Sequence, residues 1–433
     1  MEYRFALFFL FLYYIRPQDW MAGWAGVNVI KPLMLVWTTA LFVRRTPSAL
    51  PGLLRTPHDW VMLAYYVYVV WTAPDSRAAL MGFLPLVVFY ALTVQSLNTW
   101  ERVAGYLKMW NWMLLTVAAI AVASLYGLDL TGAQDVTSRN AGRLAIGTWL
   151  HNNPNSLAHT IVVALPLSYL AWFWRGGAAG RLVLFPASAA LIWSCAYHTS
   201  SRGAYLVAGG LVVLLFFIGR PFIVKMIALA TAGTVGISAL SYLPRMSDMS
   251  NLGNDEGVMG RLMAWEMART TLDSHATGLG WKQFVAWISW EGETFSKSTH
   301  SSYVQIGADL GLYGLFLFVA GLWVAHRSLA QRAPHYTGSD RDREFSRRAA
   351  LVLVVAYAVS NWMINREYHT EYFLLIAVAA AIHRLGASET TAPQESEVKT
   401  QSRWSFPDWR DGMASALLTW TVLYIWDYVL VNL

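Results

Sequence analysis

The sequence predicts an all-α polytopic membrane protein with about 12 transmembrane helices and a long, helical loop outside the membrane. Of its 433 residues, 56% are hydrophobic and 13% are charged, whereas an ordinary soluble domain is about 25% charged. The mean hydropathy is +0.38, and apolar runs recur along nearly the whole chain. The polar remainder is too small to enclose a separate globular domain. We therefore expect residues 1–433 to form a single transmembrane domain and not a soluble enzyme.

Each expected span is an apolar run, because a hydrocarbon core about 30 Å thick needs roughly 17 to 25 helical residues. The first run, residues 1–15, lacks the small-residue cleavage site of a secretory signal, so we expect it to remain as a span. The other runs are at about 27–43, 59–73, 78–97, 109–126, 157–174, 182–197, 204–219, 222–243, 303–325, 349–364 and 371–383. A final run at about 413–431 is either a thirteenth span or a helix lying against the bundle, and Asp427 within it slightly favours the second interpretation.

The basic residues predict the orientation, because Lys and Arg are retained on the cytoplasmic side of a membrane. With the N-terminus inside, 20 of the 32 Lys and Arg residues fall in cytoplasmic segments. These segments include a cytoplasmic linker at 384–412, which contains a low-complexity stretch at 386–402. Most of the basic residues behind the net charge of +6 are then explained by the orientation of the chain in the membrane. We therefore expect no nucleic-acid partner. The single cysteine, Cys195, can form no disulfide within the chain.

Two joints on the expected outer face are unusually long, at about 127–156 and 244–302. Helical periodicity from Arg261 to Arg269 predicts a helix in the second joint, followed by a break at Gly278-Leu279-Gly280. Trp281, Phe284, Trp287 and Ile288 then have the spacing of one helical face. We expect a second helix there, lying in the interface plane with its aromatic side in the lipid or stacked on a sugar.

Three outer helix starts carry polar sequences, at 151–156, 199–203 and 299–303. A helix N-terminus presents unpaired N–H groups and the positive end of its dipole, which favours anions. Capping alone explains the Ser, Thr and Asn residues, but it does not call for Arg202 or His300. Together with Arg261, these residues would place two guanidinium groups and an imidazole on one face of the membrane, and Arg suits bidentate binding of phosphate.

Two further polar positions have a structural and a functional interpretation. Asp309, about two turns into the span at 303–325, needs a partner because an unpaired carboxylate is costly in a membrane. Its partner is either a neighbouring helix or a substrate. Arg366, in the outer joint at 365–371, belongs to a satisfied polar turn or contacts a phosphate or sugar. No His and Cys residues have the spacing of a zinc site, and we expect no metal and no cofactor.

The polar motifs, taken in order, resemble the conserved blocks of the O-antigen ligase and polymerase superfamily. The resemblance covers roughly residues 150 to 330 by motif, and each motif is short. Ser301 and Asp309 stand where Asn and Glu are common in the family. The matching segments are Asn153-Pro154-Asn155, Ser201-Arg202-Gly203-Ala204, Gly260-Arg261, Gly278-Leu279-Gly280, His300-Ser301-Ser302-Tyr303-Val304-Gln305 and Asp309-Leu310-Gly311-Leu312-Tyr313-Gly314.

The resemblance implies a glycosyltransferase of the bacterial inner membrane with its active site facing the periplasm. Its donor would be a glycan linked to undecaprenyl pyrophosphate, and its acceptor lipid A-core. Catalysis would be inverting and independent of metal, with His300, Arg202 and Arg261 as catalytic residues. Further substrate contacts would come from Asn153, Asn155, Ser201, Arg139, Arg143, Tyr303, Gln305, Asp309 and Arg366.

Other functions are compatible with parts of this pattern. The same superfamily includes O-antigen polymerases and protein O-oligosaccharyltransferases, which the sequence does not separate from ligases. A transporter of lipid-linked glycans would also have about twelve spans. Transporters, however, bind substrate near the midplane between inverted repeats. The chain has no such repeat, and its ionisable residues gather at the outer ends of spans, which favours the transferase.

Overall fold

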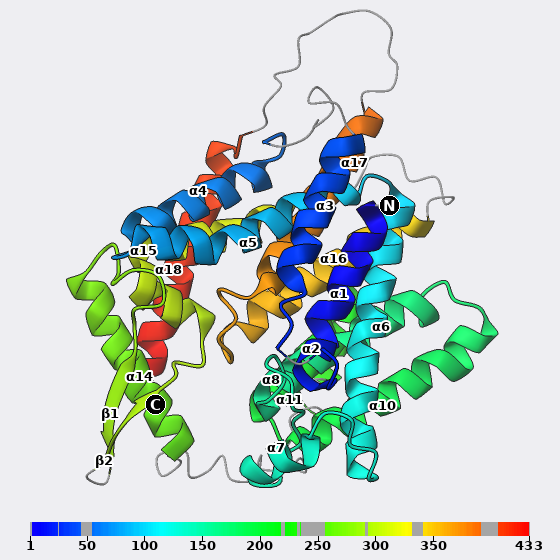
Figure 1. The fold of residues 1–433 in the computed structure, drawn as a ribbon, viewed down its shortest axis with the longest axis horizontal. Coiled ribbons are helices and arrows are strands. Elements are labelled where there is room, and N and C mark those ends of the chain that lie inside the picture. Colours follow the sequence, from blue (N-terminus) through cyan, green and yellow to red (C-terminus); the bar gives the residue numbers. More distant parts are fainter. Residues whose placement is uncertain are drawn as a thin grey trace, which may run out of the picture. The chain divides into compact units, whose positions relative to one another are not determined.

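The computed structural model describes residues 2–24, 26–44, 54–217, 221–231, 234, 256–290, 293–330, 341–390 and 406–432 (Figure 1). The described chain is mainly helical, with two short strands, which confirms the all-α class. Its contacts divide it into two compact units. The first comprises residues 1–37, 104–250 and 341–360, and the second comprises residues 38–103, 251–340 and 361–433.

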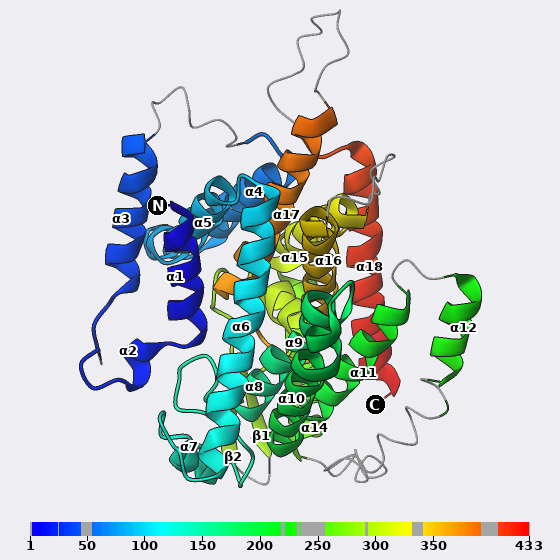
Figure 2. The same ribbon diagram turned by 90° about the vertical axis from the view of Figure 1, so that its right-hand side faces the viewer.

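The first unit is built from helices, most of which follow the apolar runs. They are α1 (Glu2–Tyr14), α2 (Pro17–Trp20), most of α6 (Trp100–Leu125), α7 (Ala133–Arg139), α8 (Pro154–Val162), α9 (Ala164–Ser168), the π-helices η2 (Tyr169–Phe173) and η3 (Gly180–Leu184), α10 (Phe185–Thr199), α11 (Arg202–Phe217), α12 (Phe222–Thr231) and α16 (Arg341–Ser360). Helix α3 (Ile30–Arg44) is shared between the units. Figure 2 shows α8, α9, α10 and α11 side by side, and small residues such as Ala158, Ala196 and Ala204 form their buried contact.

The second unit is centred on one long helix, α15 (Ser302–Ala330), which packs against four others. These are α4 (Pro57–Thr72), α14 (Glu256–Ser274), α17 (Thr370–Thr390) and α18 (Trp409–Asn432), while α5 (Ser76–Ser96) covers α4 and α17. Phe318 of α15 stacks on Tyr372 of α17 with ring centroids 4.6 Å apart. Both rings are fully buried, so they form the centre of this unit's core.

Seven helices in the described residues are long and apolar enough to cross a membrane, and the chain is a multi-pass membrane protein. They are Ser76–Ser96, Trp100–Leu125, Pro154–Phe173, Gly180–Thr199, Ser302–Ala330, Thr370–Ala387 and Trp409–Asn432. The last of these is the run at 413–431, which has the length of a span and also packs along α15. The remaining runs form shorter helices or, in α16, a helix that begins with charged residues.

Some expectations fall on residues outside the described ranges. The run at 222–243 is described only to Thr231 and at Thr234, and the loop at 244–302 only from Glu256, apart from 291–292. Within the linker at 384–412, α17 continues to Thr390 and α18 begins at Trp409. Residues 391–405 between them lie outside the described residues.

The loop at 244–302 contains one expected helix and one unexpected hairpin. Helix α14 confirms the helical periodicity around Arg261. The prediction of a second helix from Trp281 to Ile288 was wrong. Part of this segment belongs to the strand β1 (Ala286–Trp290), which pairs antiparallel with β2 (Glu293–Lys297). The side chains from Phe284 to Ile288 are alternately buried and exposed. Buried Ile288 and exposed Trp287 therefore follow the period of two typical of a half-buried strand, which overrides the helical spacing.

Candidate functional site

His300 lies in the turn between β2 and α15, in a backbone conformation that side chains rarely adopt. Its φ is 50°, in the left-handed region. Such a residue costs of order 1 kcal/mol or more unless its neighbours hold it. Here they do, because the indole of Trp265 donates to the Thr299 carbonyl over 2.7 Å, and the His300 amide donates to the Ser298 hydroxyl over 3.4 Å. These two hydrogen bonds therefore hold the turn that carries the imidazole.

The environment of His300 favours a neutral imidazole. Burial lowers its pKa to about 4, and the positive charges of Arg261 on α14 and Lys297 on β2 contribute to the same shift. At neutral pH the ring is unprotonated and can accept a proton, as a general base must. Of the three residues that the sequence predicts on one face of the membrane, His300 and Arg261 both belong to the second unit, and Arg202 belongs to the first.

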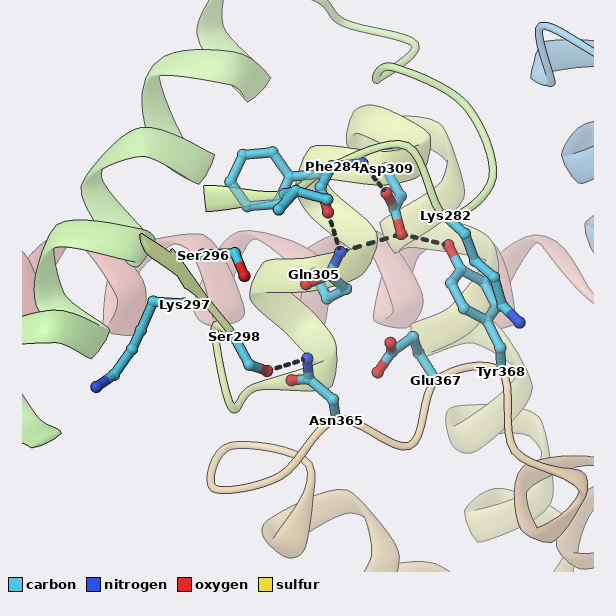
Figure 3. Close-up of a pocket in the computed structure, with 11 residues that line it drawn as sticks. Lys282, Phe284, Ser296, Lys297, Ser298, Gln305, Asp309, Asn365, Glu367 and Tyr368 are labelled. Carbon is cyan, nitrogen blue, oxygen red and sulfur yellow. Dashed lines mark hydrogen bonds between the residues drawn. The ribbon is translucent and has the colours of Figure 1, made fainter. Parts of the chain in front are cut away.

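Asp309 on α15 holds together three segments of the second unit. Its Oδ1 accepts the amide of Phe284 over 2.8 Å, and its Oδ2 accepts the hydroxyl of Tyr368 over 3.0 Å and Nε2 of Gln305 over 3.3 Å (Figure 3). Gln305 also donates to the Phe284 carbonyl over 3.1 Å. The printed partners of Asp309 thus lie in the segment before β1, in the joint before α17 and on α15 itself, and not on a neighbouring helix.

The two glycine motifs form one joint, a relationship that the sequence alone does not suggest. Helix α15 is broken at Gly311, whose φ of 66° and ψ of −166° are not helical. The carbonyls of Ala308 and Asp309 accept the amides of Leu279 and Gly280 over 3.1 and 2.6 Å. A Cβ on Gly278 or Gly311 would meet the backbone of the opposite segment. Only glycine permits both the positive φ and this close approach.

A cavity of about 350 Å³ opens beside these residues, entirely within the second unit. Figure 3 shows the side chain of Glu367 pointing into it between Asn365 and Tyr368. Burial raises the pKa of Glu367 to about 8, so this carboxyl group is protonated at neutral pH. The sequence does not single out Glu367, although this residue lies in the polar joint at 365–371 that contains Arg366.

Two residues of the second unit that were predicted to contact substrate, Arg366 and Tyr303, contact protein side chains in the structure. The guanidinium of Arg366 is buried and pairs with Glu371 over 2.7 Å, and its amide donates to the Ser302 hydroxyl over 2.8 Å. Tyr303 is buried against Trp362 and Phe318, with ring centroids 4.9 and 5.9 Å away. Their contacts are those of structural residues in the second unit.

In the first unit, Arg143 connects two of the predicted motifs. Its Nε donates to the Thr199 carbonyl over 3.0 Å, and its Nη2 donates to Oδ1 of Asn155 over 2.7 Å. Asn153 caps α8, and its side chain accepts the Asn155 amide over 2.8 Å. The Asn-Pro-Asn segment is thereby fixed to the corner that begins α11.

The remaining predicted residues of the first unit lie at helix ends. Buried Ser201 immediately precedes Arg202, the first residue of α11, where an anion would meet the positive end of the helix dipole. Arg139, at the end of α7, pairs with Asp135 over 2.6 Å and lines a second cavity of about 320 Å³ with Trp149 and Asn152. The first unit therefore presents a cation and a helix N-terminus in one corner.

The comparison with protein families gives a match over part of the chain. Residues 187–319 match the family model described as O-Antigen ligase. The matched segment runs from α10 into α15 and includes Arg202, Arg261, His300 and Asp309. This match confirms the resemblance to the O-antigen ligase superfamily. A search of curated proteins finds no match to this chain.

Proposed function

We propose that the protein is an O-antigen ligase, because residues 187–319 match the O-Antigen ligase family model and the chain is a multi-pass membrane protein. It transfers a glycan from undecaprenyl pyrophosphate to lipid A-core at the periplasmic face of the inner membrane, in lipopolysaccharide biosynthesis. The observation that carries the proposal is His300, which is partly buried and holds a neutral imidazole among positive charges. The neutral imidazole has a free lone pair that can accept a proton, and the positive charges of Arg261 and Lys297 suit a pyrophosphate bound beside it.

In the proposed reaction, a hydroxyl oxygen of the acceptor attacks the anomeric carbon of the donor. The new glycosidic bond forms as the bond from that carbon to the pyrophosphate oxygen breaks, which inverts the anomeric centre. The hydroxyl proton passes to the imidazole of His300, and undecaprenyl pyrophosphate leaves. Arg202 and Arg261 neutralise the negative charge that develops on the leaving oxygen. The protein itself supplies these groups, so the proposal requires no metal.

The test is reconstitution of the purified protein in lipid with undecaprenyl-pyrophosphate-linked glycan and lipid A-core, with and without chelator. We expect a glycan joined to lipid A-core in both conditions, resolved by gel and mass spectrometry. His300→Ala and Arg202→Ala should lose the product while remaining folded. The exposed Arg77→Ala serves as the matched control. A ladder of longer polyprenyl-linked glycans would instead identify a polymerase, and transfer to a protein substrate an O-oligosaccharyltransferase.

A further inference from the structure

The cavity beside Glu367 has the composition of a binding site for a charged sugar. Its walls carry carboxamides, hydroxyls, aromatic rings and two lysines, contributed among others by Lys282, Lys297, Ser298, Gln305, Asn365 and Tyr368. Amides and hydroxyls supply the paired donors and acceptors that sugar hydroxyls need. The volume of about 350 Å³ lies within the range of small-molecule sites.

The cavity contains a buried group with unused hydrogen-bonding capacity. Glu367 is 7% exposed, and within the described part of the chain its Oε2 has no hydrogen-bond partner. A buried polar atom without a partner is costly. Figure 3 shows this carboxyl group directed into the cavity, where a ligand hydroxyl would satisfy it.

The charge balance of the cavity favours an anion. Asp309 is already surrounded by three hydrogen-bond donors, and the raised pKa of Glu367, about 8, keeps that carboxyl group neutral. The ammonium of Lys282 lies over the rings of Trp281 and Tyr368, at 4.9 and 5.9 Å from their centroids. Cation–π contacts of this kind hold a lysine in place without neutralising its charge. Lys297 lines the opposite flank, where its ammonium lies 5.5 Å from the centroid of the Phe295 ring and is directed away from Glu367 (Figure 3).

The cavity also adjoins the proposed base. The Ser298 hydroxyl accepts the His300 amide over 3.4 Å and the side-chain amide of Asn365 over 2.9 Å. Ser298 and Asn365 both line the cavity. A sugar bound between Asn365 and Glu367 would therefore lie next to the turn that carries His300, and a hydroxyl that His300 deprotonates belongs to the acceptor.

We propose that this cavity is the acceptor subsite and that it binds a sugar bearing a phosphate or carboxylate group. Lys282 pairs with that anionic group, and Glu367 and Asn365 hydrogen-bond the hydroxyls of the same sugar. This inference rests on the proposed transferase function. It adds a substrate class, an anionic acceptor sugar, and two recognition residues, Lys282 and Glu367, outside the residues proposed for catalysis.

The experiment compares Lys282→Gln and Glu367→Gln with the unaltered protein in reconstituted lipid, with KM measured separately for acceptor and donor. We expect Lys282→Gln to raise the acceptor KM about tenfold, the loss of one charge-assisted hydrogen bond, with a much smaller change in donor KM or kcat. Glu367→Gln keeps a neutral hydrogen-bonding group of the same shape and should leave the acceptor KM nearly unchanged, whereas Glu367→Ala removes that group and should raise the acceptor KM. Lys108→Gln, an exposed lysine of the first unit, is the control.

Two modified acceptors identify the charged group. Dephosphorylated lipid A-core should bind the unaltered protein and Lys282→Gln equally weakly if the group is a phosphate, and carboxyl-reduced lipid A-core should do so if it is a carboxylate. An acceptor KM that Lys282→Gln leaves unchanged, or a larger rise in donor KM, would overturn the proposal. If the unaltered protein makes no product, the proposed function fails separately. Calorimetric titration with lipid-free core oligosaccharide then still tests the cavity, and equal binding by Lys282→Gln would overturn the subsite.

Discussion

The amide nitrogen of Phe284 donates to Oδ1 of Asp309 over 2.8 Å, so a carboxylate inside α15 fixes the segment that enters the β hairpin. The opposite carboxylate oxygen accepts from Tyr368 over 3.0 Å. One buried side chain thereby sets the positions of two walls of the acceptor cavity relative to the helix that follows His300. The site depends on this residue without requiring it to touch a substrate.

Asp309→Ala should therefore destabilise the protein as well as reduce transfer. The substitution leaves the Phe284 amide and the Tyr368 hydroxyl without their acceptor, and each such loss costs about 1 to 3 kcal/mol. Thermal unfolding in detergent should show a lower Tm, and Asp309→Asn, which keeps one oxygen, should have a Tm between those of the alanine variant and the unaltered protein. An unchanged Tm in Asp309→Ala would show that the carboxylate does not hold these segments.

Gly311→Ala should disrupt the joint between α15 and the segment at 276–280. A Cβ at this position would collide with the backbone of Ala276 and Gly278, and the φ of 66° disfavours alanine in any case. We expect a loss of at least a few kcal/mol of stability, measured as reduced yield of monodisperse protein and a lower Tm. Gly209→Ala is the matched control, since a Cβ there would meet no atom within 4 Å; equal behaviour of the two variants would contradict the joint.

The pH dependence of transfer should report His300. Because burial and the charges of Arg261 and Lys297 lower its pKa to about 4, the base is neutral above that pH and becomes inactive only as the pH falls through about 4. Removing a positive neighbour raises the pKa, so Arg261→Gln should move the acid limb of the pH–rate profile upward, toward the ordinary value near 6.5. Its overall rate should also fall. An acid limb already near 6.5 in the unaltered protein would exclude this role for His300.

Arg366 offers a test between a structural and a substrate-binding role. Its buried pair with Glu371 means that Glu371→Ala leaves a guanidinium without that partner, at a cost of about 3 to 5 kcal/mol. The double substitution Arg366→Met with Glu371→Leu should recover much of the lost Tm and of the activity. If stability recovers while activity stays absent, Arg366 contacts substrate, as the family resemblance implies.

The helices were largely predictable from the sequence because a bilayer imposes a minimum length on each apolar run. The hairpin was not, since Trp281, Phe284, Trp287 and Ile288 satisfy a helical spacing while the chain around them alternates between buried and exposed residues. The alternation of buried and exposed positions selects a strand only when α14 and α15 provide a surface against which the hairpin packs. The π-helical turns around Trp172 and Leu184 likewise have no period that separates them from ordinary helix.

The residue types of the candidate site were predictable from the sequence, but the contacts between its segments were less so. His300 and Arg261 stood out as residue types that capping does not explain, and the structure brings them into electrostatic contact. Nothing in the sequence indicates that Gly278 and Gly311 meet, because that contact joins two segments far apart in the chain. Glu367 was missed because an acidic residue in a polar turn has no local feature that distinguishes a buried carboxyl group from a solvated one.

The joint between α15 and the segment at 276–280 has a consequence for how acceptor preference could evolve. Leu279 and Gly280 are anchored through their backbone amides, so the course of the chain there does not depend on the side chain that follows them. Lys282, two residues later, has an exposed side chain and a φ of 57°, so residues that tolerate the left-handed region, such as asparagine or aspartate, could replace it without moving the hairpin. A lineage could in this way change the sugar it accepts by single substitutions at the cavity rim, while the turn that carries the base is inherited unaltered.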